Sequence, residues 1–108
     1  MASRNSIIVE KLIAYTDKIL AYCEGSDYES FTADSKLVEA CVFNLRQMGE
    51  LANRIDDDFA QAHAEIPWRL LYGLRNRIVH DYEGVNMQLI WEIIHDDLIP
   101  LRDALTRI

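Results

Sequence analysis

The sequence contains few residues that interrupt regular structure. It has only four glycines and two prolines in 108 residues. Half of the residues are apolar, which is typical of a folded globule and not of a disordered chain. Long apolar segments with so little punctuation favour helices over a β fold with many turns. The length suits a single domain over residues 1–108.

Cysteines and long apolar runs are also scarce. Cys23 and Cys41 are too few for a disulfide framework, and neither belongs to a CxxC motif. We predict that both are reduced, packed thiols in a cytoplasmic protein. Charged residues spread through the first twenty positions argue against a signal peptide. No apolar run approaches the roughly 18 residues that a membrane span needs, so we expect no membrane contact.

Basic residues are in the minority, and the net charge of −7 argues against a general polyanion binder. One stretch departs from this balance. Residues 67–80 contain Arg69, Arg75 and Arg77 and no acid. The other eight basic residues are outnumbered by 18 acids, a balance of −10. A small cationic spot on an acidic body predicts a local anion site, not a groove that follows a long phosphate backbone.

Apolar residues recur with helical periodicity along most of the chain. In the first helix the apolar stripe is formed by Ile8, Leu12, Tyr15, Ile19 and Tyr22. In the second it is formed by Val38, Cys41 or Val42, Leu45, Met48, Ala52 and Ile55. In the last helix it is formed by Ile90, Ile94, Leu98, Leu101, Leu105 and Ile108. Asn5 or Ser6 can cap the first helix, Gly25 can end it, and the polar connection that follows contains one large apolar residue, Phe31. Asp34 or Ser35 can cap the second helix, and Asn86 the last. The predicted helices cover residues 6–24, 35–55, 57–64, 68–81 and 86–108.

Three local features qualify these helices. Gly49 lies inside the second helix, where glycine costs about 1 kcal/mol relative to alanine, so we expect a close helix crossing there. The acids at 56–58 suit the start of a helix better than a cation site. Pro100 should kink or split the last helix.

Residues 75–82 hold the groups best suited to chemistry. His80 can give or accept a proton near neutral pH, and Arg75 offers a cationic fork for a phosphate or a developing oxyanion. Asn76 can hydrogen-bond to His80 or to a phosphate oxygen. Tyr82 can donate a hydrogen bond, stack on a base or carry a modification. Since RNA supplies its own 2′-hydroxyl nucleophile, histidine and arginine would suffice to cleave it without a metal.

Helix geometry complicates this interpretation. At 100° per residue, Arg75 and His80 point about 140° apart, whereas Asn76 and His80 are about 40° apart. The last turn could unwind, the arginine side chain could wrap back, or two chains could complete the site. The competing interpretation is structural: cationic side chains at a helix C-terminus simply bind free carbonyls. His63, His80 and His95 lack metal-ligand spacing with one another, so we predict no metal and no cofactor.

The spacing Arg75, four residues, His80, one residue, Tyr82 resembles the Arg-x4-His-x-Tyr motif of the HEPN superfamily. Further segments are similar to its HepT branch: Ile66-Pro67-Trp68, Met48-Gly49-Glu50, and Trp91 to Ile94 with Leu98 and Pro100. The resemblance implies an all-α, up-and-down bundle of four to five helices that dimerises through the motif region.

The resemblance also implies a function. HepT proteins are toxins of type VII-like toxin–antitoxin systems and act as metal-independent RNA endonucleases. Their partner is a minimal nucleotidyltransferase antitoxin, MntA, which transfers AMP to the motif tyrosine. By position, Arg75 and His80 would be catalytic, Asn76 and Glu50 supporting, and Tyr82 the AMPylated residue. Whether such dimers assemble further with the antitoxin stays open.

Two alternatives use the same residues. The bundle could be a non-catalytic subunit that binds a nucleotide through Arg75 or holds a nucleotidyltransferase, which the acidic surface favours slightly. It could also be a structural dimer in which the motif only closes the interface.

Overall fold

The computed structural model describes residues 3–81 and 86–108, except the side chains of residues 77–81. These residues form helices and no strands, as predicted. The elements are α1 (Arg4–Tyr22), α2 (Tyr28–Ala33), α3 (Ser35–Ala52), α4 (Asp57–Ala62), α5 (Trp68–Asp81), α6 (Met87–Glu92), the π-helical segment η1 (Ile93–Asp97) and α7 (Leu98–Thr106).

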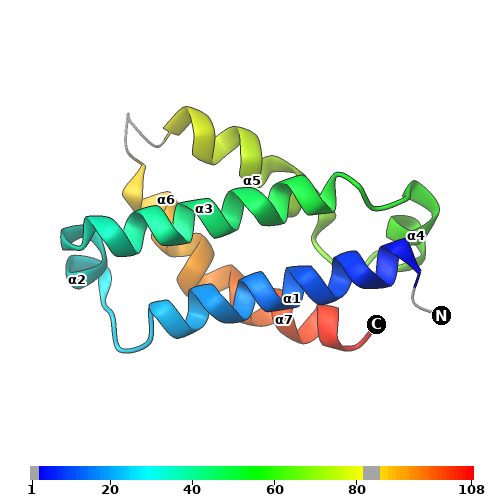
Figure 1. The fold of residues 1–108 in the computed structure, drawn as a ribbon, viewed down its shortest axis with the longest axis horizontal. Helices are drawn as coiled ribbons and strands as arrows, with labels where there is room; N and C mark the ends of the chain where they lie inside the picture. Colours follow the sequence, from blue (N-terminus) through cyan, green and yellow to red (C-terminus); the bar gives the residue numbers. More distant parts are fainter. Residues whose placement is uncertain (1–2, 82–85) are drawn as a thin grey trace.

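The long helices lie side by side with α3 in a central position. Figure 1 shows α3 between α5 and α1, with α7 on the other side of α1. The short helices α2 and α4 lie at opposite ends of the molecule, and α6 runs behind α3 toward the α7 layer (Figure 1). α3 packs on both α1 and α5, so it lies between the first helix and the helix that contains Arg69, Arg75 and Arg77.

The core follows the predicted apolar stripes closely. In α3 the stripe is buried from Val38 to Ala52, Ile55 is buried just after the helix, and in the C-terminal segment the stripe is buried from Ile90 to Leu105. Ile108 was predicted to extend that last stripe, but it is 43% exposed. In α1 the stripe was wrong at Tyr22, which is 46% exposed, while Thr16 is buried. Thr16 can be buried because its hydroxyl donates to the Leu12 carbonyl at 2.8 Å.

Helix ends confirm several predicted caps and correct others. The side chains of Asp34 and Asn86 accept hydrogen bonds from the first turns of α3 and α6, and Gly25 has a positive φ of 78°. The first cap was misplaced, because Ser3, and not Asn5 or Ser6, caps α1. The Asn5 side chain instead pairs with Asp56 at the start of α4.

The predicted polar connection before α3 is in fact the helix α2. Asp27 caps it and shares a reciprocal capping box with Ser30. Its apolar residue, Phe31, is fully buried and lies against the Trp91 ring of α6, with 5.2 Å between centroids. The capping box fixes the start of α2, and the buried ring anchors it to the bundle.

The C-terminal helix is interrupted, as Pro100 predicted, but the irregular turn lies before the proline. Leu98 N–H donates to the Ile93 carbonyl, five residues back, which defines the widened turn of η1. A proline ring clashes with the carbonyl four residues earlier in a regular helix, here that of Asp96. The wide turn contains Asp96, and Pro100 then sits in the first turn of α7, where its missing N–H is harmless.

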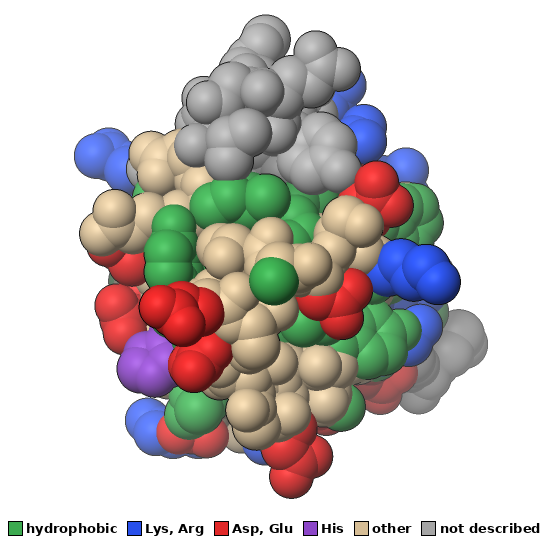
Figure 2. All heavy atoms as spheres, turned by 90° about the vertical axis from the view of Figure 1, so that its left-hand side faces the viewer, with side chains coloured by type: hydrophobic (Ala, Val, Ile, Leu, Met, Phe, Trp, Pro, Cys, Tyr) green, Lys and Arg blue, Asp and Glu red, His purple; other side chains and the backbone are tan. Residues whose placement is uncertain are grey.

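The surface is mixed in charge, as the composition requires. Figure 2 shows the end of the molecule near α2 and α6, where acidic side chains lie scattered among polar ones and basic ones appear at the margins. In the described part of the chain, no helix is long and apolar enough to cross a membrane.

Candidate active site

Arg75 lies where α5 crosses α3, and Gly49 makes this crossing close. A Cβ built at Gly49 would lie 2.8 Å from the Arg75 backbone nitrogen and 3.2 Å from its Cβ. Such distances are too short for a real side chain, so only glycine allows the two backbones to approach this closely. The expectation of a close crossing at Gly49 is confirmed, and its partner is the arginine of the motif.

The residue after that glycine holds the Arg75 side chain. Arg75 Nε forms an ion pair with Glu50 Oε1 at 2.8 Å, and the two side chains are 57% and 42% exposed. Glu50 therefore reaches from α3 to α5. The contact with Glu50 is through Nε and does not engage the two terminal nitrogens of the guanidinium, which are able to donate to an anion.

The other motif residues are described to different extents. Asn76 is exposed on α5 beside Arg75. His80 belongs to α5, but its side chain lies outside the described residues, as does the whole of Tyr82. α5 is helical to Asp81, and the predicted alternative of unwinding before Gly84 concerns residues that lie outside the described ones.

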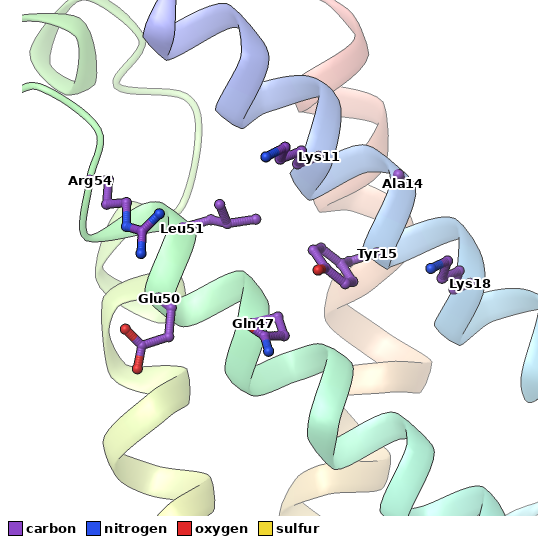
Figure 3. A pocket seen from close by; sticks show the side chains of 8 residues that line it. All are labelled: Lys11, Ala14, Tyr15, Lys18, Gln47, Glu50, Leu51 and Arg54. Atoms are coloured by element: carbon purple, nitrogen blue, oxygen red, sulfur yellow. The ribbon is translucent and has the colours of Figure 1, made fainter.

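A groove between α1 and α3 was not foreseen from the sequence. It encloses about 290 Å³ and is lined by Lys11, Ala14, Tyr15, Lys18, Gln47, Glu50, Leu51 and Arg54. We call it the α1–α3 groove. Figure 3 shows its α1 side chains extending toward α3, while Glu50 extends toward the α5 side. The spacing of Lys11, Tyr15 and Lys18 by four and three residues puts them on one helix face, a signal that could have revealed this wall.

The other histidines have structural surroundings. His63 is half-buried, with its ring 4.5 Å from that of Phe59 and its carbonyl accepting from Trp68 Nε1. His95 is exposed and contacts Asp96 through Nδ1 at 3.0 Å. Within the described ranges, no three His, Cys, Asp or Glu residues are grouped to hold a metal ion.

The all-α bundle agrees with comparisons to known proteins. The family model described as "Ribonuclease HepT-like" matches residues 12–108. The chain therefore belongs to the HepT-like ribonuclease family, within the HEPN superfamily.

Relatives at moderate identity carry consistent names. A candidate RNase of Caldanaerobacter subterraneus subsp. tengcongensis is 32% identical over 87% of this chain and 90% of its own length. A probable ribonuclease HepT of Thermococcus cleftensis is 33% identical over 69% of this chain and 68% of its own. A candidate RNase of Methanocaldococcus jannaschii is 30% identical over 75% of this chain and 70% of its own. No solved structure matches the chain.

Proposed function

We propose that this chain is a metal-independent RNA endonuclease and the toxic component of a type VII-like toxin–antitoxin system. The observation that carries the proposal is the Arg75 side chain, held by Glu50 at 2.8 Å beside a glycine crossing. It begins the Arg-x4-His-x-Tyr spacing in a chain of the HepT-like ribonuclease family. The names of the relatives support ribonuclease activity.

The reaction needs few protein groups. The 2′-hydroxyl of a ribose attacks the adjacent phosphorus while its proton passes to a base, and the bond to the 5′-oxygen breaks as that oxygen receives a proton. His80 is the proton-transfer group in this scheme, because histidine is the side chain that ordinarily exchanges a proton near neutral pH. Arg75 stabilises the negative charge that builds on the phosphate oxygens. Asn76, beside Arg75 on α5, supports the phosphate or the His80 ring.

Glu50 acts as a positioning residue in this scheme. Its carboxylate occupies Arg75 Nε, so the guanidinium has one fixed edge and presents the other to substrate. A long arginine side chain otherwise loses much rotational freedom when it binds. Pairing with Glu50 before substrate arrives reduces that loss and keeps the fork in place.

A homodimer would resolve the divergence of Arg75 and His80. Both belong to α5, which is helical to Asp81, and in a regular helix positions five residues apart are separated by about 140°. If the α5 helices of two copies meet, Arg75 from one copy and His80 from the other can converge on a single phosphate. A twofold interface would create two such sites.

Tyr82 gives the proposed site an off-switch. A minimal nucleotidyltransferase antitoxin of the MntA type would transfer AMP from ATP: the phenolic oxygen attacks the α-phosphorus, the phenol loses its proton, and pyrophosphate leaves. The product places a phosphodiester charge and an adenine seven residues after Arg75. That charge would occupy the cationic spot and exclude the substrate phosphate.

The test uses purified protein and single-stranded RNA in EDTA. Wild type should cleave, whereas Arg75→Ala and His80→Ala should remain folded and lose activity. After co-expression with the nucleotidyltransferase, intact mass should show an AMP increment that Tyr82→Phe lacks, together with loss of cleavage. Equal cleavage by His80→Ala would remove that residue from the mechanism. No cleavage at any concentration, with AMP binding that depends on Arg75, would favour the non-catalytic nucleotide-binding subunit.

A further inference from the structure

The α1–α3 groove continues across α3 toward the motif helix. A second cavity, of about 300 Å³, shares Gln47, Glu50 and Arg54 with it and adds Phe43 and Arg46. Glu50, which lines both cavities, holds Arg75. The hollowed surface therefore leads from α1 over α3 to the proposed catalytic arginine.

The walls of this surface are cationic although the chain is acidic. Lys11 and Lys18 come from α1, and Arg54 follows the end of α3 (Figure 3). In the described part of the chain, none of these three cations lies within 4.0 Å of a carboxylate oxygen. The one acid in the lining, Glu50, is already paired with Arg75. Unpaired cations around a cavity attract an anion.

An aromatic ring lies between the two lysines. Tyr15 is half-buried in the α1 wall, and Lys18 Nζ lies 5.5 Å from the centre of its ring. Gln47 faces it from α3 with an amide that can both donate and accept hydrogen bonds (Figure 3). Cations for phosphates beside an aromatic face for a base are the usual composition of single-strand binding surfaces. A cavity of about 290 Å³ suits one unstacked nucleotide and is too small for a duplex.

We propose that the α1–α3 groove is a substrate subsite that binds a single-stranded RNA nucleotide on one side of the cleaved phosphate. Lys11, Lys18 and Arg54 neutralise its backbone phosphates, and Tyr15 stacks on its base. The proposal rests on the proposed ribonuclease function and adds where the substrate is held. It also explains how an acidic protein captures RNA: the strand follows a short cationic track and not the whole surface.

The first experiment removes the lysines without removing their helix. Lys11→Gln/Lys18→Gln is compared with Lys36→Gln/Arg107→Gln, which removes two exposed charges outside the groove. Cleavage of single-stranded RNA is measured with its kcat and KM, and binding of a fluorescein-labelled 2′-O-methyl oligonucleotide is measured against salt. We expect the groove variant to raise KM about tenfold with little change in kcat. Its slope of log K against log salt should shrink by about 0.7 per lost contact, whereas the control should match wild type.

The second experiment tests the stacking. Tyr15→Leu should weaken oligonucleotide binding about tenfold, and Tyr15→Phe should retain it, because the ring and not the hydroxyl makes the contact. Circular dichroism and thermal unfolding show whether each variant is folded. Equal losses in the phenylalanine and leucine variants would overturn the stacking role.

The outcomes separate this inference from the function on which it rests. If wild type cleaves RNA in an Arg75-dependent manner but the lysine variant keeps the wild-type KM and salt slope, the subsite is wrong and the function stands. If wild type binds the oligonucleotide through the lysines but never cleaves RNA, the ribonuclease proposal is wrong and the groove remains a binding site.

Discussion

Gly49 and Arg75 approach so closely that a methyl group on Gly49 would lie 2.8 Å from the backbone nitrogen of Arg75. The atom in the way belongs to the backbone of α5, so it cannot move aside as a flexible side chain would. Gly49→Ala must therefore push α3 and α5 apart, and we expect it to destabilise the fold by about 1–3 kcal/mol. Urea unfolding measures the loss.

The same substitution should also reduce activity, because it displaces Arg75 from Glu50. Gly25→Ala is the matched control. Gly25 has a φ of 78° and nothing within 4 Å of a built Cβ, so alanine there strains the backbone without moving α5. We expect Gly25→Ala to lose stability but keep the kcat of wild type. Equal kcat values for the two variants at matched folded fractions would contradict the link between the crossing and the site.

Glu50 should matter for catalysis more than for stability. The pair with Arg75 is about half exposed, and such pairs contribute about 0.2–1 kcal/mol to folding. Glu50→Ala frees the guanidinium, so we expect kcat/KM to fall about tenfold to a hundredfold, the range that misplacing a catalytic group produces. Glu50→Gln keeps an acceptor for Arg75 Nε and should recover part of the loss.

Asp17 provides the control for Glu50. It pairs with Arg102 between α1 and α7, with side chains 46% and 40% exposed, away from Arg75. Asp17→Ala also removes one arginine–carboxylate pair between helices, so it should leave kcat/KM unchanged. A similar activity loss in both variants would mean that any weakened helix contact lowers activity, and Glu50 would have no special role.

Much of the fold could be predicted because apolar periodicity and capping residues act locally. The stripe of α3 and the Asp34 and Asn86 caps depend only on residues that are close to one another in the sequence. The helix α2 was missed because its first turn uses Asp27 with Ser30 instead of the usual glutamate partner. The interruption of the last helix was expected at Pro100 but lies before it, because a proline ring clashes with the carbonyl four residues earlier.

The candidate site was only partly predictable for a different reason. Arg75 was identified from its motif, and Gly49 from its position inside a helix. That these two residues meet, with Glu50 closing on Arg75, depends on how α3 crosses α5, and no local pattern specifies that crossing. The groove formed by Lys11, Tyr15 and Lys18 was overlooked because Tyr15 fits an apolar stripe equally well. Only packing shows that its ring borders a cavity.

Asp27 should make the α2 end of the molecule sensitive to acid. The Ser30 backbone N–H, followed by the Ser30 hydroxyl, donates to Asp27 and lowers the pKa of its carboxyl. A carboxyl with a depressed pKa in the folded state stabilises the fold above its unfolded pKa, near 3.9. That stabilisation is lost as the pH falls through the lower folded pKa. We therefore expect α2 to loosen below about pH 4.

The fluorescence of Trp91 can report this loosening, because its ring lies 5.2 Å from that of Phe31 in α2. The measurement is an acid titration in a Trp68→Phe background, which leaves Trp91 as the remaining tryptophan. Asp27→Asn caps helices without titrating, so its fluorescence should stay flatter between pH 5 and pH 3. Superimposable titrations with and without the Asp27→Asn substitution would show that other carboxyls control this end.

Cys23 and Cys41 should differ in reactivity although their sulfurs are 3.5 Å apart. A hydrogen bond from Cys41 lowers the pKa of Cys23 more than burial raises it, whereas the bond to Cys23, followed by burial, raises the pKa of Cys41. Cys23 is also 9% exposed, while Cys41 is fully buried. Since the thiolate is the nucleophile, iodoacetamide should modify Cys23 first.

The pH dependence of this alkylation tests the cause. Cys41→Ala removes the donor, so the midpoint for Cys23 modification should move to higher pH, whereas Cys41→Ser retains a hydroxyl donor and should stay closer to wild type. Peptide mass spectrometry across a pH series gives the rates for each cysteine. The same midpoint in all three proteins would mean that burial, and not the neighbouring thiol, controls Cys23. Faster modification of Cys41 than of Cys23 would contradict the assignment of donor and acceptor itself.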